Sequence, residues 1–198
     1  MVFKYLLLAV AYLLGSIPFS VILGTKIKGI DIRNHGSGNP GGTNSLRFLG
    51  KKIGLTVLFL DGLKAGLIVL LIQTGVLDGS QLLHPLAYGV AAAFGHVYSI
   101  FIKFKGGKAV ATTVGMMIAF NPLYAFIMMV VFLIILKIWK YVSVASTAAV
   151  LTAVIIGLVT KDFEMAIFTG ILLVLVTYRH KKNFNNIKNN VEPKVTWI

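Results

Sequence analysis

The sequence predicts an all-α protein that crosses a membrane several times. Of its 198 residues 57% are hydrophobic and 13% are charged, whereas about 25% of a soluble domain is charged. Lys and Arg number 19 against 6 Asp and Glu. In so apolar a chain this excess indicates cytoplasmic loops first, and anionic partners such as phosphates or acidic lipid headgroups second. We expect membrane lipid as a partner, and no nucleic acid.

Seven apolar segments are candidate membrane spans, since a membrane helix needs about 20 apolar residues. The first is interrupted by Gly15-Ser16 and Pro18, which predict a bent inner end. The seven cover residues 3–23, 53–73, 85–103, 109 to the break at Asn121-Pro122, 123–136, 142–159 and 163–178.

Charge decides whether the long apolar run 109–136 crosses the membrane once or twice. The loops on either side of it, 104–108 and 137–141, are both basic. Two crossings, separated at Asn121-Pro122, put both loops on the cytoplasmic side. The seven-span topology then places the amino terminus outside and the carboxyl terminus in the cytoplasm.

This topology gathers the chemistry-bearing segments on one face of a single membrane-embedded domain, residues 1–198. The face consists of loops 24–52, 104–108 and 137–141 and the tail 179–198. We expect the polar tail to lie on the membrane surface. A soluble phosphorylated substrate could enter at this face while a lipid-like chain arrives from the bilayer.

A glycine-rich loop, G-S-G-N-P-G-G at residues 36–42, is the first candidate anion site. Four of its seven residues are glycine, so the backbone can adopt positive φ and turn N–H groups toward one point. Arg33 and Arg47 flank it, and Ser37 and Thr43 add short hydrogen-bonding groups. The alternative is a flexible loop between two membrane helices.

A second basic glycine loop, F-K-G-G-K-A-V-A-T from Phe104, precedes an apolar run. Gly106, Gly107 and Lys108 are predicted to open that helix, with free N–H groups and the helix dipole facing an anion. The alternative is a surface anchor whose lysines touch headgroups. Neither loop is a Walker A motif, because Lys108 is followed by Ala109 rather than Ser or Thr.

Several single residues have both a structural and a chemical interpretation. Asp61 and Lys64 lie three residues apart inside the second span, and we expect a structural ion pair. His96 is expected to be a packing residue, and Ser143 to cap the sixth helix. His180 follows the last span, where a histidine is usually solvated unless it has a function.

What the chain lacks restricts its chemistry. It has no cysteine and therefore no thiolate nucleophile, and its six acidic residues are scattered. No His, Asp and Glu show metal spacing, so we expect no metal and no cofactor. No histidine is followed at the fifth position by Asp, which removes the usual pair of acyl-CoA-dependent acyltransferases.

Short motifs follow one another along nearly the whole chain. They are G-S-I-P-F-S at Gly15, G-S-G-N-P-G-G-T-N-S-L-R at Gly36, F-L-D-G-L-K at Phe59, G-H-V-Y-S-I-F at Gly95, F-K-G-G-K-A-V-A-T at Phe104, K-Y-V-S-V-A-S at Lys140 and Y-R-H-K-K-N at Tyr178. In this order they resemble the motif set of the PlsY-type acyl-phosphate:glycerol-3-phosphate acyltransferases, which are bacterial inner-membrane enzymes. The tail departs from the family's pattern, which has Ile at the position of Phe184 and Arg at the position of Asn186.

The resemblance implies transfer of an acyl group from acyl phosphate to the 1-hydroxyl of glycerol 3-phosphate, giving lysophosphatidic acid and phosphate in the first step of phospholipid synthesis. It implies a bacterial inner-membrane protein, which we expect to be a monomer. On this basis the catalytic residues are His180, Ser37 and Lys108. The glycerol 3-phosphate residues are Ser37, Arg47, Lys108, His180 and Asn183. The acyl-phosphate residues are Asn39, Gly41, Gly42, Thr43, Asn44, Gly106, Gly107 and Ser143.

Two alternatives stay open at this point. The base that accepts the hydroxyl proton is either His180 or the substrate's own phosphate. The competing class is a permease or binding protein for a phosphate ester. Transport favours polar groups on both faces or at the midplane and an inverted repeat, and the sequence shows neither.

Overall fold

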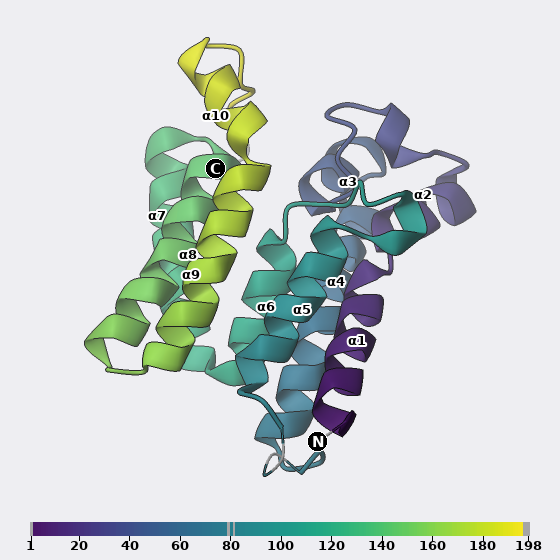
Figure 1. Ribbon diagram of the computed structural model, residues 1–198. Coiled ribbons are helices and arrows are strands. Elements are labelled where there is room, and N and C mark those ends of the chain that lie inside the picture. The colour runs from purple at the N-terminus through teal and green to yellow at the C-terminus, as the bar shows by residue number, and fades with distance from the viewer. Residues whose placement is uncertain (1, 79, 81, 196–198) are drawn as a thin grey trace. The chain divides into compact units, whose positions relative to one another are not determined.

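The computed structural model describes residues 2–78, 80 and 82–195, and every regular element in this part of the chain is a helix. The contacts between helices divide the chain into two compact units, residues 1–120 and 121–198, which are described separately (Figure 1). The first unit contains α1 Val2–Ser16, α2 Phe19–Lys28, the 3₁₀ turn η1 Ile32–Asn34, α3 Gly42–Phe48, α4 Lys51–Gln73, α5 Pro85–Val97, the 3₁₀ turn η3 Ile100–Ile102 and α6 Val110–Phe120. The second unit contains α7 Pro122–Trp139, α8 Val142–Val159, α9 Phe163–Arg179 and α10 Lys181–Lys188.

Five segments of the described chain are long and apolar enough to cross a membrane. A sixth is obtained if α9 and α10, which bend by 52° at their junction, count as one span. Helix α6 is apolar but has only 11 residues. The chain is therefore a multi-pass helical membrane protein, and the count of seven spans stays a prediction.

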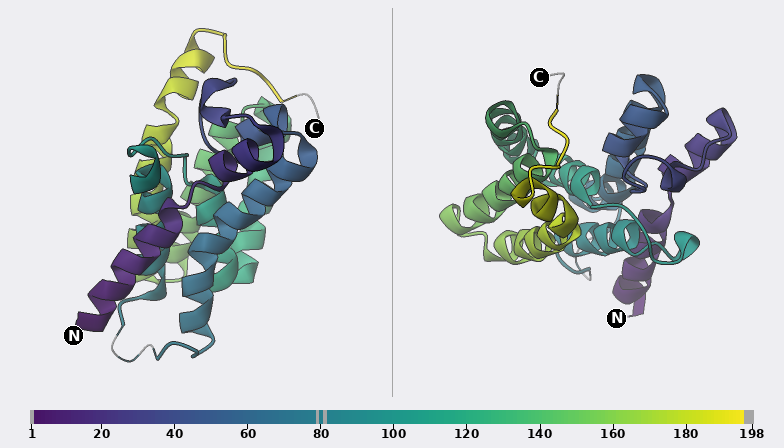
Figure 2. Two further views of the ribbon diagram at one scale, coloured as in Figure 1. Left: turned by 90° about the vertical axis from the view of Figure 1, so that its right-hand side faces the viewer. Right: turned by 90° about the horizontal axis from the view of Figure 1, so that it is seen from above.

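The predicted bend in the first span is confirmed between α1 and α2, where the chain changes direction (Figure 2). Pro18 has no N–H group and cannot continue the helical hydrogen bonds. Two carbonyls at the end of α1 accept from outside the helix instead. The Ser99 hydroxyl donates to Ser16 O at 2.5 Å, and Lys64 Nζ donates to Ile17 O at 3.0 Å.

The predicted break at Asn121-Pro122 is also confirmed, since α6 ends at Phe120 and α7 begins at Pro122. The Asn121 side chain accepts hydrogen bonds from the N–H groups of Leu123 and Tyr124 at 3.1 and 3.3 Å. Pro122 occupies the first helical position, where no N–H partner is needed. The dipeptide thus ends one helix and caps the next.

The predicted third span, residues 85–103, agrees with the apolar span Pro85–Ile102. Within it the regular helix α5 ends at Val97, and the short turn η3 follows. The chain folds back there: Phe104 N donates to Ser99 O at 2.8 Å and Gly106 N to Val97 O at 2.9 Å. Lys103 and Phe104 have positive φ angles of 54° and 59°, which no helix continues.

Small residues allow close approach of the helices in the first unit. A Cβ at Gly115 of α6 would lie 2.2 Å from the carbonyl oxygen of Gly62 on α4. A Cβ at Gly15 of α1 would lie 2.0 Å from the carbonyl oxygen of Ala92 on α5. Such backbone-to-backbone packing is typical of membrane helices, and it fixes the helix ends that carry the two glycine loops.

The tail of the second unit folds back on its own unit. Val195 N donates to Lys140 O at 2.9 Å, and the Val195 side chain is buried with Leu136 and Ala145. The expected location of the tail on the membrane surface stays a prediction. Residues 196–198 lie outside the described part of the chain.

Candidate active site

The two glycine loops lie at the same end of the first unit, opposite the chain's N-terminus (Figures 1 and 2). The first, residues 36–42, connects η1 to α3, and the second, residues 104–109, connects η3 to α6. The predicted site residues differ in exposure. Ser37, Thr43 and Arg47 are exposed; Asn39, Lys108 and Asn183 are half-buried; Gly41, Gly42, Asn44, Gly106, Gly107, Ser143 and His180 are buried.

Asn44 holds the first loop in shape. Its amide donates to His35 O at 2.9 Å and to Ile32 O at 3.3 Å, and its Oδ1 accepts from Ser37 N at 3.3 Å. Its side chain is 4% exposed. The Asn44 side chain thus joins three parts of the loop backbone, while its predicted contact with the acyl-phosphate head stays a prediction.

The expected nest of backbone N–H groups is only partly met. Gly36 and Gly38 have the predicted positive φ angles, 58° and 68°. However, Gly38 N donates to His35 O at 3.0 Å and Gly41 N to Asn39 O at 2.9 Å. These N–H groups, like that of Ser37, are used within the loop.

Gly42 is a packing glycine. A Cβ at this position would lie 2.1 Å from Leu58 Cδ2, where the start of α3 meets α4. A larger residue would push α3 away from α4. Gly42 thus sets the position of the helix that carries Thr43 and Arg47.

The two arginines of the first loop region differ in their surroundings. Arg33 donates to both carboxylate oxygens of Asp31, with the shortest contact at 2.6 Å. These hydrogen bonds hold the pKa of Asp31 below its usual value. Arg47 lies exposed in the last turn of α3.

The second loop differs from its prediction in one respect. Gly106 N donates to Val97 O at 2.9 Å and Gly107 N to His96 O at 3.0 Å, so these N–H groups bond to backbone rather than facing an anion. A Cβ at Gly106 would lie 1.9 Å from His96 O. The glycines allow the loop to pack against the end of α5, and Lys108 follows as the charged group.

A buried polar cluster lies beneath this loop. The predicted ion pair is confirmed: Lys64 Nζ is 2.9 Å from Asp61 Oδ1, and the two residues are 6% and 2% exposed. His96 was expected only to pack, but its Nδ1 lies 3.6 Å from the same Asp61 oxygen. Sequence spacing gave no signal for this third member, because it comes from another helix.

In the second unit, His180 is buried rather than solvated, with 4% of its surface exposed. It lies between α9 and α10, and its Nδ1 is 2.8 Å from Val176 O. A carbonyl accepts only, so Nδ1 carries a hydrogen and donates it to Val176 O.

Asn183 and Ser143 are the other predicted site residues of this unit. Asn183 Nδ2 donates to Glu192 Oε1 at 2.5 Å, so the carboxylate orients the amide. Ser143 does not cap α8: the cap position is Tyr141, without a side-chain hydrogen bond. The Ser143 hydroxyl is buried, with no hydrogen-bond partner among the described residues.

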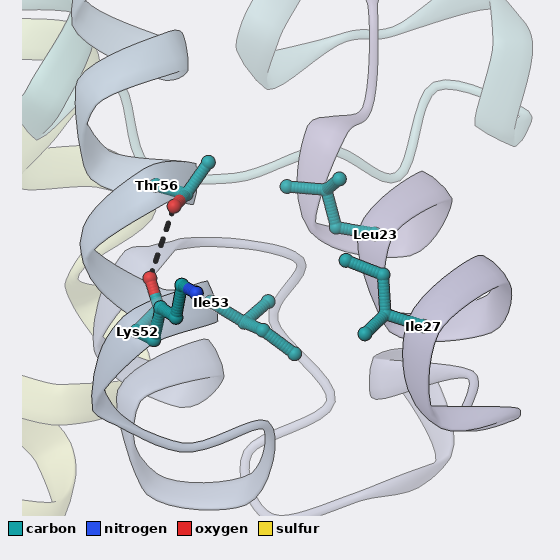
Figure 3. A pocket seen from close by; sticks show the side chains of 5 residues that line it. All are labelled: Leu23, Ile27, Lys52, Ile53 and Thr56. Atoms are coloured by element: carbon teal, nitrogen blue, oxygen red, sulfur yellow. Dashed lines mark hydrogen bonds between the residues drawn. The ribbon is translucent and has the colours of Figure 1, made fainter.

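A cavity of about 190 Å³ lies between α2 and α4 of the first unit (Figure 3). Leu23 and Ile27 from α2 face Ile53 from α4 across it, and Thr56 donates to Lys52 O at its edge. No predicted site residue lines this cavity. It is an apolar gap beside a helix pair and does not mark the candidate active site.

The fold and the loops define a multi-pass membrane protein with clustered groups suited to phosphate. The chain matches the sequence model of the glycerol-3-phosphate acyltransferase family over residues 5–190. It is 48% identical to glycerol-3-phosphate acyltransferase 3 of Bacillus anthracis, over 100% of this chain and 98% of that protein. It is 45% identical to glycerol-3-phosphate acyltransferase of Bacillus subtilis, over 98% of both.

Two crystal structures of PlsY, an integral membrane glycerol 3-phosphate acyltransferase, have the same fold. The glycerol 3-phosphate form superposes with a TM-score of 0.89 at 37% identity, over 98% of this chain and 96% of that one. The lysophosphatidic acid form gives 0.87 at 37% identity, over 98% and 95%. The chain belongs to the glycerol-3-phosphate acyltransferase family and is an acyltransferase.

Proposed function

We propose that this enzyme transfers a fatty acyl group from acyl phosphate to the 1-hydroxyl of sn-glycerol 3-phosphate, in the first step of phospholipid synthesis. The observation that carries the proposal is the likeness to PlsY in two ligand forms, glycerol 3-phosphate and lysophosphatidic acid. These two molecules differ by one acyl group on a glycerol oxygen. The first is therefore the acceptor and the second the product.

Acyl phosphate is the donor that best fits this chain. Its carbonyl is already activated by a phosphate leaving group, so the enzyme needs mainly positioning and charge stabilisation. A donor and an acceptor that each carry phosphate account for two basic glycine loops. No group of three or more His, Asp or Glu in the described residues could hold a metal ion, and we propose metal-free, cofactor-free transfer.

In the first unit, we assign Arg47, Lys108 and Ser37 to the phosphate and hydroxyl groups of glycerol 3-phosphate. Arg47 and Ser37 are exposed and Lys108 is half-buried at the same end of the unit. Asn39 and Thr43 are assigned to the acyl-phosphate head, with the buried glycines of both loops supporting the backbone there. Charge-assisted hydrogen bonds to phosphate are the strongest contacts available to such groups.

In the second unit, His180 is proposed as the base and Asn183 as a ligand of glycerol 3-phosphate. The contact of Nδ1 with Val176 O supports this role, because it orients the buried imidazole. The glycerol oxygen then forms the new bond to the acyl carbon, and the bond from that carbon to the phosphate oxygen breaks. Inorganic phosphate leaves with the bonding electrons. The unpartnered hydroxyl of Ser143 is assigned to the acyl-phosphate head.

The proposed setting is the bacterial cytoplasmic membrane, where the chain acts as a monomer with seven spans. The asymmetry of Lys and Arg among the loops supports an external amino terminus and a cytoplasmic carboxyl terminus. Soluble glycerol 3-phosphate would then reach the enzyme from the cytoplasm.

The proposal is tested with purified protein in lipid, synthetic acyl phosphate and glycerol 3-phosphate, without acyl-CoA or added metal. We expect lysophosphatidic acid and one equivalent of inorganic phosphate. A requirement for acyl-CoA would overturn the donor assignment. Uptake of glycerol 3-phosphate into sealed vesicles without turnover would instead favour a permease.

A further inference from the structure

The buried cluster of Asp61, Lys64 and His96 is not explained by substrate binding, because all three side chains lie beneath the loops. Asp61 and Lys64 are one turn apart on α4, and their contact is 2.9 Å. The Lys64 ammonium also donates to Ile17 O at 3.0 Å and lies 5.8 Å from the centre of the Phe19 ring. One end of the cluster thus holds the break between α1 and α2.

The other end of the cluster holds the second glycine loop. His96 Nδ1 is 3.6 Å from Asp61 Oδ1. On the opposite edge of the ring, a Cβ at Gly107 would lie 2.1 Å from Nε2, so the loop backbone is packed directly on the imidazole. The His96 carbonyl also accepts from Gly107 N at 3.0 Å. His96 therefore contacts the ion pair on one side and the residue before Lys108 on the other.

The loop needs such support because its backbone is unfavourable by itself. Phe104 and Ala109, on either side of the glycines, have φ angles of 59° and 60°. Non-glycine residues in this region persist only where the surroundings hold them. A buried ion pair is in general no more stabilising than well-packed apolar residues. A gain in stability therefore does not explain the Asp61–Lys64 pair, whereas a role in holding the loop backbone does.

We infer that Asp61, Lys64 and His96 are positioning residues that fix the 106–108 loop, and with it the ammonium group of Lys108, relative to the broken end of α1. The inference rests on the proposed function, in which Lys108 binds a substrate phosphate. Such a contact requires placement within about 0.5 Å. The cluster supplies it through side chains that do not touch substrate.

A double-mutant cycle between His96 and Lys108 tests the inference in the full-length enzyme in lipid. In the wild-type background, Lys108→Ala should lower kcat/KM for glycerol 3-phosphate by roughly 10- to 100-fold. His96→Ala should lower it by nearly the same factor as Lys108→Ala, mainly through a higher KM. In the His96→Ala background, Lys108→Ala should then cost less than about 3-fold, because the lysine is already misplaced.

Each other outcome has a distinct meaning. If the two effects multiply while Lys108→Ala alone is damaging, His96 does not position Lys108 and the inference is wrong, although the proposed role of Lys108 stands. If Lys108→Ala alone is silent, the proposed role of Lys108 fails and the inference fails with it.

Two further variants separate positioning from general destabilisation. Asp61→Asn keeps the shape of the side chain. Its effect on kcat/KM combined with that of Lys108→Ala should likewise be smaller than the product of the two, and this test holds even if His96→Ala inserts poorly into the membrane. His96→Asn keeps a donor near the position of Nδ1 and should recover part of the lost kcat/KM. His84→Asn is the matched control: this histidine begins α5 and its ring contacts Phe120, so its effect should simply multiply with that of Lys108→Ala.

Discussion

The Nδ1 atom of His180 lies 2.8 Å from the carbonyl oxygen of Val176, one turn earlier in α9. The same carbonyl also accepts a hydrogen bond from His180 N at 3.0 Å, near the end of the helix. The imidazole is buried between α9 and α10. The contact with Val176 O therefore orients the ring.

Two amide variants distinguish proton transfer from binding at His180. His180→Asn retains a donor near Nδ1, and His180→Gln places an amide near Nε2, but neither accepts a proton. We expect both to lower kcat by roughly 10²- to 10⁴-fold, as loss of a general base does. The measurement is steady-state turnover with both substrates varied. Near-normal kcat with a raised KM in the glutamine variant would assign His180 to binding and proton acceptance to the substrate phosphate.

Arg47 should contribute a phosphate contact that Arg33 does not. Loss of one charge-assisted contact costs about 1.5–3 kcal/mol, or roughly one to two decades in kcat/KM. We therefore expect that fall for Arg47→Ala. Arg33→Ala is the matched control, because this guanidinium is bonded to Asp31 in the same loop region, and it should change kcat/KM less than about 3-fold. Equal effects of the two variants would remove the special role of Arg47.

The proposed topology predicts which loops face the cytoplasm. Cysteines introduced at Lys51 and Val76, at opposite ends of α4, are both on exposed positions of a cysteine-free chain. In intact cells a membrane-impermeant thiol reagent should label Val76→Cys alone, and Lys51→Cys should label only after the membrane is opened. Labelling of both from outside would contradict the seven-span arrangement.

Glu192 joins the tail to α10 and explains how a departure from the family's pattern is accommodated. Its oxygens accept from Asn183 at 2.5 Å and from Asn186 at 3.1 Å, and Asn186 occupies the position where the pattern has arginine. Glu192→Ala should destabilise the enzyme by about 1–2 kcal/mol and raise the KM for glycerol 3-phosphate, because the Asn183 amide loses its orientation.

The converse change tests the same contact. Asn186→Arg adds a charged donor opposite Glu192, and we expect a gain of about 0.5–1 kcal/mol, since the pair is only partly buried. Thermal unfolding in detergent, followed by tryptophan fluorescence, measures both variants. Asn185→Arg, at an exposed position of the same helix, is the control and should leave stability unchanged. A gain of the same size from this control would show a general charge effect.

Local chemistry explains which parts of the fold could be predicted from the sequence. The predicted span 142–159 coincides with α8, and both helix breaks lie at prolines, whose missing N–H acts within a single turn. The Asp61 and Lys64 pair is likewise local, three residues apart on one helix. Such features depend on neighbours along the chain, which a sequence displays directly.

The contacts that the sequence did not predict join residues that are distant along the chain. Val195 pairs with Lys140, and His96 joins Asp61 from another helix. In the first glycine loop the residue types predicted positive φ angles, which Gly36 and Gly38 have. In neither loop did the sequence show which oxygens accept hydrogen bonds from the N–H groups. Gly107 was predicted to face an anion, whereas its glycine is required by the His96 ring. The predicted substrate contacts themselves remain predictions.

Direct transfer without an acyl-enzyme is the last expectation, and it follows from the nucleophiles that the chain offers. It has no cysteine. A serine nucleophile needs a nearby base that is itself oriented by a third group. Ser37 is exposed, and its hydroxyl accepts from Asn39 N at 3.4 Å. The Ser143 hydroxyl has no hydrogen-bond partner in the described chain.

We therefore expect no covalent acyl group on the enzyme after incubation with acyl phosphate alone. Intact-mass spectrometry of the denatured protein measures this directly, because an acyl chain on Ser37, Ser143 or His180 adds its full mass. Wild-type enzyme and the His180→Gln variant should both show the unmodified mass, while only the wild type forms lysophosphatidic acid once glycerol 3-phosphate is added. A stoichiometric adduct in the wild type that disappears on addition of glycerol 3-phosphate would establish a two-step mechanism. The same adduct persisting in His180→Gln would then place His180 in the second step, as the group that activates the glycerol hydroxyl.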